Sequence, residues 1–270
     1  MIRDRLRYHA PADVETACRI LGDSPSAAVI GGGTIAVPRL GRGELRADDI
    51  VHLSRAGLAE VVLSEGELRI GSMVTYAGLL ATPGIEQLNP LLCTVARGIT
   101  GGDQIRNQGT LGGSICHANP ASDVPTALVA LRARLVLHSI EGEREVPAGE
   151  FLRGGFQADI RPGEILTHIL VRPVDRSGYH KFKLSESSWP IVTAAATLTH
   201  DRQCHVVLGG VEPVPVRIDL SQIVGTESTI RELVAATVRP TWSDALAPAE
   251  YRHLISGEIA ARAVAQLGGV

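Results

Sequence analysis

The stretch QIRNQGTLGGSICHANPASD, residues 104–123, is the most informative part of this chain. It combines glycines, which let a backbone approach a ligand closely, with short side chains that carry hydroxyl groups and one carboxylate. These residues are Gly109, Thr110, Gly112, Gly113, Ser114 and Asp123. The stretch predicts a cradle for a polar, phosphorylated cofactor. The alternative is a glycine-rich turn between two strands.

A second glycine-rich loop lies closer to the N-terminus. The apolar residues 27–30 predict a short buried parallel strand, which runs directly into the sequence GGGT of residues 31–34. A strand followed by a glycine loop and then by a helix or turn binds phosphate, because its bare N–H groups point at the anion. The loop is neither a Rossmann fingerprint nor a P-loop, since G-x-G-x-x-G and Gly-Lys-Ser/Thr are both absent. A tight turn between strand and helix is the alternative.

The composition indicates a globular protein. The chain has 270 residues, 44% hydrophobic and 20% charged, enough for one large domain or two to three small ones. A net charge of −3 without a basic run, and only 3% aromatic residues, argue against a nucleic-acid partner. The charged N-terminus is not a secretory signal, and no apolar run approaches the roughly 20 residues that span a bilayer. We therefore expect a cytoplasmic chain without a membrane partner.

The cysteines and histidines show no pattern of a metal site. Cys18, Cys93, Cys116 and Cys204 form no CxxC pair, and their spacing fits no zinc or iron–sulfur pattern. The nine histidines are scattered without an HExxH motif. We expect four reduced, mostly buried thiols, no metal and no iron–sulfur cluster in this chain. No catalytic triad or carboxylate pair is recognisable either.

Residues 104–125 resemble the flavin-binding subunit or domain of the molybdenum hydroxylases, the family of carbon monoxide dehydrogenase and the xanthine dehydrogenases. The family pattern is close to QIRN-x-GT-(I/V/L)-GGS, then A-(D/N)-P-A-(S/A)-(D/E)-x-P, and this chain has QIRNQGTLGGS, then ANPASDVP. Further matches are the GGGT loop, RPGEIL at residues 161–166, the Tyr-x-Lys-Phe that begins at Tyr179, and LGGVEPVPVR at residues 208–217. The resemblance covers essentially the whole chain.

The resemblance implies an α+β fold of the PCMH type, in which FAD lies in a cleft between two α+β subdomains. A smaller C-terminal domain with helices and a three-stranded antiparallel sheet follows. We expect the FAD-binding domain at residues 1–172, with subdomains at about 1–55 and 56–172, and the C-terminal domain at residues 177–270. Pro173, Asp175 and Ser177 interrupt the pattern at this boundary.

The resemblance also implies where FAD is bound. The first loop holds the pyrophosphate in the family, the leucine of RPGEIL packs against the cofactor, and one branch has a lysine near the flavin where Lys183 stands. Asp123 is assigned to sugar or ribityl hydroxyls, with a helix N-cap as the alternative, while a core leucine and a surface lysine are the alternatives for Leu166 and Lys183. A flavin carries the redox chemistry itself, so no residue is predicted to be catalytic or to bind a metal. The predicted FAD-binding residues are Val29, Ile30, Gly31, Gly32, Gly33, Thr34, Ile35, Ala36, Val37, Thr110, Gly112, Gly113, Ser114, Asp123, Leu166 and Lys183.

The function implied by the resemblance is that of the FAD-binding subunit of a molybdenum hydroxylase. Such a subunit passes electrons from iron–sulfur clusters through FAD to NAD or another soluble acceptor, and its expected partners are an iron–sulfur small subunit and a molybdopterin large subunit. Residues 185–190, SESSWP, replace the arginine pair that borders the flavin in the family. Two alternatives therefore remain, because a fold does not decide a function: a standalone FAD-dependent oxidoreductase without molybdenum partners, and a non-catalytic nucleotide-binding scaffold.

Overall fold

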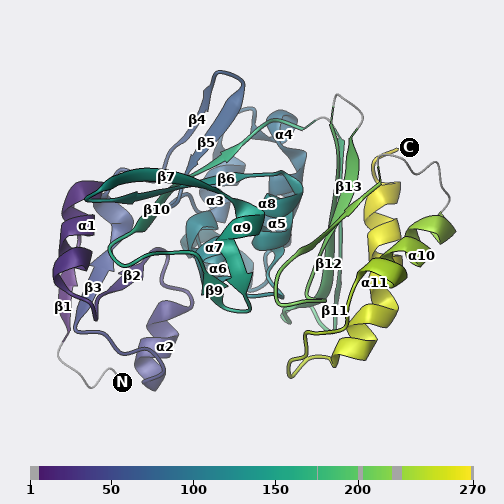
Figure 1. Ribbon diagram of the computed structural model, residues 1–270. Coiled ribbons are helices and arrows are strands. Elements are labelled where there is room, and N and C mark those ends of the chain that lie inside the picture. The colour runs from purple at the N-terminus through teal and green to yellow at the C-terminus, as the bar shows by residue number, and fades with distance from the viewer. Residues whose placement is uncertain (1–5, 175, 200–202, 221–226, 269–270) are drawn as a thin grey trace.

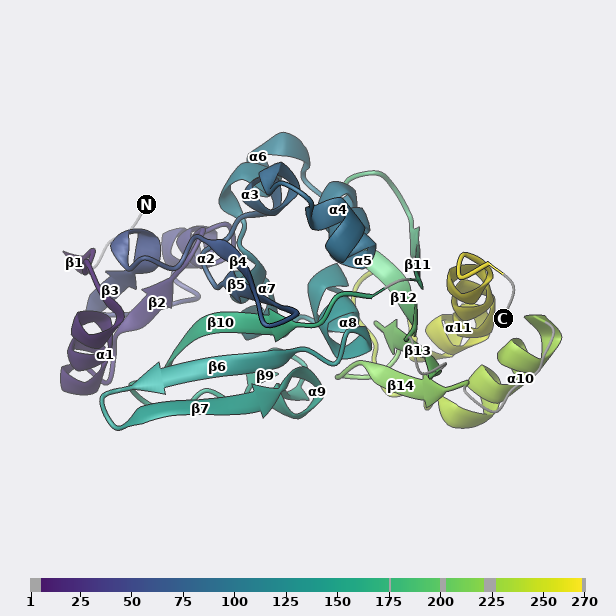
Figure 2. The same cartoon turned by 90° about the horizontal axis from the view of Figure 1, so that it is seen from above.

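The computed structural model describes residues 6–174, 176–199, 203–220 and 227–268 (Figure 1). The chain forms three successive groups of elements, which follow one another across the molecule from purple to yellow. Both views place the first group at one end and the C-terminal group at the other (Figure 2). The arrangement is an α+β fold, as expected.

The first group is a three-stranded parallel sheet, in the order β1-β3-β2, with two helices. Asp13 begins the first helix by accepting a hydrogen bond from the Thr16 N–H at 2.7 Å. The strand expected before the GGGT loop is present and parallel, but only its last residue, Ile30, is buried. The elements are β1 (Arg7–His9), α1 (Val14–Asp23), β2 (Ala28–Ile30), α2 (Ala36–Arg42), β3 (Asp49–His52) and the 3-10 helix η1 (Leu53–Arg55).

The second group is a five-stranded antiparallel sheet, in the order β4-β5-β10-β6-β7, with helices packed against it. Its last strand in the sequence, β10, lies in the centre and pairs with both local hairpins. The elements are β4 (Val61–Ser64), β5 (Glu67–Gly71), α3 (Tyr76–Ala81), α4 (Ile85–Leu88), α5 (Pro90–Gly98), α6 (Gly102–Gln108), α7 (Leu111–His117), α8 (Asp123–Ala130), β6 (Arg134–Ser139), β7 (Gly142–Pro147), α9 (Ala148–Phe151), β8 (Leu152–Gly154), β9 (Gln157–Ala158) and β10 (Ile165–Val171).

The C-terminal group is an antiparallel sheet of four strands, in the order β11-β12-β13-β14, and not of three as expected. The additional strand is a short edge strand, which directly follows the prolines at 213 and 215 and therefore lacks an obvious strand pattern. The elements are β11 (Arg176–Lys183), β12 (Pro190–Leu198), β13 (Cys204–Gly209), β14 (Val216–Asp219), α10 (Glu227–Thr237) and α11 (Ala249–Ala265). The predicted boundary falls between β10 and β11, where residue 175 lies outside the described residues. The domain limits stay predictions.

The sheet of the C-terminal group is covered on both faces. Helices α5 and α8 lie between it and the five-stranded sheet, and α11 packs on its other side (Figures 1 and 2). The largest apolar core lies around α5 and α8, where Leu91, Leu92 and Leu128 are almost fully buried. Burial of one such side chain contributes about 1.5–3 kcal/mol. Three of the four cysteines are also buried, and Cys116 is half-buried, which confirms that most of these thiols are buried.

None of the helices in the described ranges has the length and apolar character needed to cross a membrane. The same residues contain no cluster of His, Cys, Asp or Glu side chains suited to hold a metal ion.

Gly178 allows β11 to approach α11 closely. A Cβ atom at this position would lie 1.9 Å from the carbonyl oxygen of Ala263. We expect Gly178→Ala to lower the free energy of unfolding by about 1–3 kcal/mol, because the obstructing atom belongs to a helix backbone and cannot turn away. Urea unfolding followed by circular dichroism measures this effect.

Gly22→Ala is the matched control for this prediction. Gly22 lies in α1 with no atom near its missing Cβ, so alanine there stabilises the helix by at most about 1 kcal/mol. Equal stabilities of the two variants would contradict the packing argument.

Candidate functional site

The motif of residues 104–123 folds into two short helices, α6 and α7, and not into a turn between strands. Thr110 begins α7, because its Oγ1 accepts a hydrogen bond from the N–H of Gly113 at 2.9 Å. The helix ends at Ala118, whose backbone is left-handed with φ 48°. Asp123 is then the first residue of α8.

The two glycine-rich loops lie against each other. A Cβ atom on Gly32 would lie 1.7 Å from the carbonyl oxygen of Gln108, so only glycine permits this approach. A Cβ atom on Gly31 would lie 3.0 Å from Oγ1 of Thr110. Two segments far apart in the sequence therefore form one surface.

A cavity of about 550 Å³ lies at this surface. Its wall extends from β2 and the first loop, across α7 and β10, to residues 187 and 189 beside the C-terminal sheet. The predicted residues that line it are Val29, Gly31, Gly32, Gly33, Thr34, Ile35, Ala36, Thr110, Gly112, Gly113, Ser114, Asp123 and Leu166.

Three predicted residues do not line the cavity. Ile30 packs in the small core beneath the first sheet, and Val37 points to solvent from α2 with 49% of its surface exposed. Lys183 donates from Nζ to the carbonyl oxygen of Glu186 at 2.9 Å. The register between β11 and β12 shifts at this point, because Ile191 of β12 is an extra residue between the partners of Phe182 and Lys183, and no sequence pattern indicated it.

The first loop presents open hydrogen-bond donors. In the described part of the chain, the backbone N–H groups of residues 32–36 make no hydrogen bond, and these residues line the cavity. Successive free N–H groups around a concave loop attract an anion. These open donors are consistent with phosphate binding, and the role of the first loop stays a prediction.

The second loop differs from the expected backbone cradle. The N–H groups of Leu111 and Gly112 donate to the carbonyl oxygens of Val74 and Ser72, at 3.0 and 3.1 Å. Those of Gly113 and Ser114 donate to Thr110. Glycine is required at position 112 for close packing instead, since a Cβ atom there would lie 2.5 Å from Ser72. What this loop offers a ligand is its hydroxyl groups.

Asp123 is buried and is held by two donors from β11. Its Oδ1 accepts hydrogen bonds from the hydroxyl of Tyr179 and, at 2.8 Å, from Nζ of Lys181. Burial, and then the negative charge of Asp123, raise the pKa of Tyr179 well above its usual range, so this phenol stays a donor. Ser122 occupies the N-cap position, so the helix-cap alternative for Asp123 is wrong. Oδ2 makes no hydrogen bond within the described ranges and remains available as an acceptor.

Lys181 is the lysine of the Tyr-x-Lys-Phe motif that contacts the site. Its Nζ also donates to the carbonyl oxygen of Gly98 at 2.6 Å, so it connects α5, α8 and β11. Strand alternation is the sequence signal that could have identified Lys181, because residues 179 and 181 share one face of β11.

Other residues of the cavity were not identified from the sequence. Tyr76 is buried there, and its burial raises its pKa to about 12. Burial likewise raises the pKa of the Cys116 thiol to about 12. Ser72 contributes a buried hydroxyl that makes no hydrogen bond to any residue the structure describes. The carboxylate of Glu164 is bound by Arg144, at 2.6 and 2.7 Å. Ser72 and Tyr76 follow β5, in the segment GSMVTYAG of residues 71–78, which carries no charged side chain.

We expect Lys181→Met to destabilise the protein strongly. The variant leaves the buried Asp123 carboxylate without its cation, and breaking a buried ion pair in this way costs about 3–5 kcal/mol. Lys183→Met is the control, since it removes a hydrogen bond to a carbonyl oxygen and a 3.8 Å ion pair with the exposed carboxylate of Glu186, which together cost about 1 kcal/mol. Both free energies of unfolding are measured in denaturant. A larger effect at Lys183 would show that the ion pair does not stabilise the fold.

Comparison with known proteins agrees with this geometry. A family described as the FAD binding domain in molybdopterin dehydrogenase matches residues 4–173. The chain is 30% identical over 289 residues to the putative xanthine dehydrogenase FAD-binding subunit of Escherichia coli strain K12, with 98% of both chains covered. It is 28% identical over 284 residues to the carbon monoxide dehydrogenase medium chain of Hydrogenophaga pseudoflava, covering 98% of this chain and 97% of the relative.

The fold is similar to that of solved structures. One is carbon monoxide dehydrogenase from Hydrogenophaga pseudoflava, with a TM-score of 0.91, 25% identity, and coverage of 99% of this chain and 98% of the other. Quinoline 2-oxidoreductase from Pseudomonas putida 86 gives a TM-score of 0.90 at the same identity and coverage. The chain belongs to the family of FAD-binding subunits of molybdopterin-dependent oxidoreductases.

Proposed function

We propose that this subunit receives electrons from iron–sulfur clusters of a partner chain and passes them through FAD to a soluble acceptor such as NAD. The observation that carries the proposal is the cavity, which joins an open row of backbone donors to a buried, fixed carboxylate. When bound, FAD supplies reversible one- and two-electron transfer. The protein supplies binding, orientation and a defined electrostatic environment.

The residues of the cavity fit FAD. The free N–H groups of residues 32–36 suit a diphosphate, and the unpartnered Ser72 hydroxyl suits a polar atom of the ligand. Asp123 offers Oδ2 as an acceptor for a sugar or ribityl hydroxyl, while Tyr179 and Lys181 hold Oδ1. These assignments of individual residues are part of the proposal.

The side chains around the cavity limit its charge. Tyr76 and Cys116, with pKa values raised to about 12, keep their protons at neutral pH and stay neutral. Burial, and secondly the charge of Arg39, lower the pKa of His117, so that this ring stays uncharged as well. Glu164 is compensated by Arg144. A diphosphate in the cavity therefore meets little repulsion.

The names of the relatives support the partners in the proposal. One relative is a "medium chain" and another, from Paenarthrobacter nicotinovorans, a "medium subunit", so each is one of several chains. We infer that this chain likewise assembles with an iron–sulfur small subunit and a molybdopterin large subunit.

We expect Gly32→Ala to reduce the amount of FAD that the protein retains, because the new methyl group pushes the first loop away from Gln108. The change is measured as the ratio of flavin to protein absorbance after gel filtration, and we expect a loss of more than half. Gly149→Ala is the control, since the nearest atom to its Cβ lies at an ordinary contact distance of 3.9 Å. Full retention of FAD by Gly32→Ala would show that the first loop is not part of the FAD site.

We expect the isolated FAD-loaded chain to be inert towards organic substrates. Anaerobic stopped-flow with purines, aldehydes or carbon monoxide should show no bleaching of the flavin, whereas addition of the partner chains and their substrate should bleach it. Rapid stoichiometric bleaching without any partner would instead make this chain a standalone oxidoreductase.

A further inference from the structure

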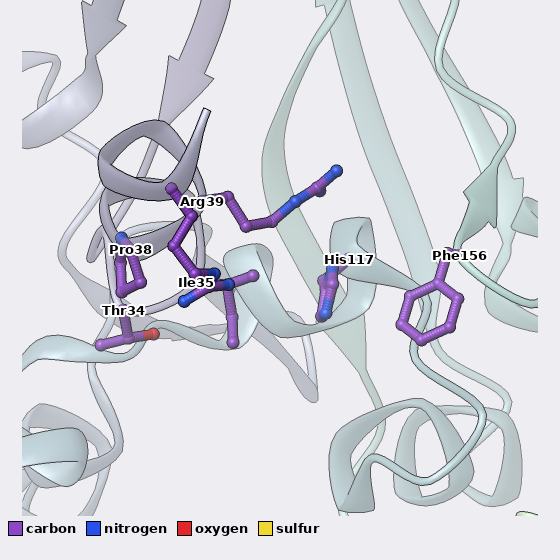
Figure 3. Close-up of a pocket in the computed structure, with 7 residues that line it drawn as sticks. Thr34, Ile35, Pro38, Arg39, His117 and Phe156 are labelled. Atoms are coloured by element: carbon purple, nitrogen blue, oxygen red, sulfur yellow. The ribbon is translucent and has the colours of Figure 1, made fainter. Parts of the chain in front are cut away.

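A cavity of about 510 Å³, which we call the distal cavity, lies at the junction of the five-stranded sheet and the C-terminal sheet. Its wall comes from the segments 130–134 and 170–174, together with side chains of β5, β12 and β13. None of the described residues that line it also lines the FAD cavity. The cavity in Figure 3 differs in this respect, because it shares four residues with the FAD cavity, including Arg39 and His117, and is part of that site.

Helix α8 separates the distal cavity from the FAD cavity. The helix begins at Asp123, which lines the FAD cavity, and ends at Ala130, which lines the distal one. Its 8 residues span about 12 Å. A ligand in the distal cavity therefore lies at the opposite end of α8 from Asp123.

The wall of the distal cavity is apolar over much of its area. Leu131, Leu170 and Val174 belong to it, and all three are buried in the fold. His205 adds a buried ring, whose Nε2 donates to the carbonyl oxygen of Ala130 at 2.7 Å. Burial is the main reason that the pKa of His205 is lowered to about 4, so the ring is neutral. Since cavities for small molecules have volumes of about 300–1,000 Å³, this one is large enough for the apolar part of an organic ligand.

Two arginines in this wall carry a charge that no carboxylate balances. In the described part of the chain, Arg172 is exposed and makes no hydrogen bond and no ion pair. Arg132 donates from Nη2 to Oε1 of Gln203 at 2.6 Å, but this partner is a neutral amide. Guanidinium groups in this situation bind a carboxylate or a phosphate through their planar set of donors.

The remaining charges of the wall already neutralise each other. Arg134 is held at 2.6 Å by Glu67 and at 2.6 Å by Glu145. Glu67 is the one carboxylate among the described residues of the wall, so none is left for the other two arginines. The surplus of positive charge also affects a neighbour: burial, and after it the charge of Arg132, lower the pKa of Arg217.

Arg132 holds its place against the preference of its backbone. It directly follows the last turn of α8 with a left-handed φ of 49°, and its N–H donates to the carbonyl oxygen of Val129 at 3.1 Å. Glycine is the usual residue at this position after a helix, because other residues adopt the conformation at a cost. The side chain is exposed, so burial does not offset that cost. Strain of this kind is concentrated at functional sites.

We propose that the distal cavity binds a small organic anion, with its carboxylate or phosphate on Arg132 and Arg172 and its apolar body against Leu131, Leu170 and Val174. The site is additional to the FAD cavity, since the two walls have no described residue in common. It does not depend on the route of the electrons through the flavin.

The test uses the full chain loaded with FAD, so that the FAD cavity is filled. Calorimetric titration with octanoate should show binding. Acetate lacks the apolar body and octanol lacks the charge, so each should bind at least tenfold more weakly. Octyl phosphate distinguishes the two head groups, because the tighter ligand of the pair identifies the class. The proposal is wrong if neither octanoate nor octyl phosphate binds, or if octanol binds as tightly as octanoate.

Arg172→Gln tests the cationic part of the site. We expect it to weaken octanoate at least tenfold and to leave the flavin content and the midpoint of thermal unfolding unchanged. Arg55→Gln is the matched control, because Arg55 is an exposed arginine outside both cavities without an ion pair in the described chain. Equal affinities of the two variants for octanoate would overturn the assignment of Arg172.

Arg132→Gly separates binding from structure. Glycine relieves the left-handed backbone, so the midpoint of thermal unfolding should stay the same or rise while the affinity for octanoate falls at least tenfold. A purely structural role of Arg132 would instead lower the midpoint and leave the affinity unchanged, which would exclude this residue from the site.

The same titration of the complete complex checks that the cavity stays open in the assembly. We expect the affinity for octanoate to match that of the FAD-loaded chain. Binding by the isolated chain that disappears in the complex would overturn the proposal and assign the two arginines to a contact with a partner chain.

Discussion

The contact between Gly32 and the carbonyl oxygen of Gln108 is the constraint on which the rest of the site depends. It joins a loop of the parallel sheet to a loop between two helices, and it leaves no room for a single methyl group. Because the loops touch there, the residues with open N–H groups in one loop and the residues with hydroxyl groups in the other line the same cavity. The lining of the cavity therefore comes from both the first and the second group of elements.

A second constraint is the buried pair of Asp123 and Lys181. It connects the start of α8, the end of α5 and strand β11 through three hydrogen bonds, and so attaches the C-terminal sheet to the wall of the cavity. The low dielectric of the interior makes this contact sensitive to the loss of either partner. The C-terminal sheet therefore takes part in defining the cavity, although residues 187 and 189 are the only described residues from its side that line it.

Much of this arrangement follows from the residues themselves. The motif of residues 104–123 and the GGGT loop were both identified as parts of the site, and the two short helices, the loop contact and the cavity connect them. What sequence reasoning missed depends on three-dimensional register. Lys183 was assigned from the resemblance alone and stays a prediction, while the contact of Lys181 with Asp123 was missed because it joins residues 58 positions apart. The backbone N–H groups of the second loop were expected to be free for a ligand. Two of them instead donate to the carbonyl oxygens of Val74 and Ser72, which follow a strand distant in the sequence. The edge strand β14 was missed because prolines precede it.

The central position of β10 has a consequence for how the protein folds. The hairpins β4–β5 and β6–β7 join neighbours in the sequence, but β10 must pair with both, including with Gly71 about a hundred residues earlier. During synthesis the two hairpins are complete while the strand between them is still missing, and their inner edges are open to wrong partners. Leu166 of β10 also lines the cavity, so a nascent chain has no complete cavity until this strand has emerged. A ligand of this cavity can then stabilise only chains that have already closed the sheet.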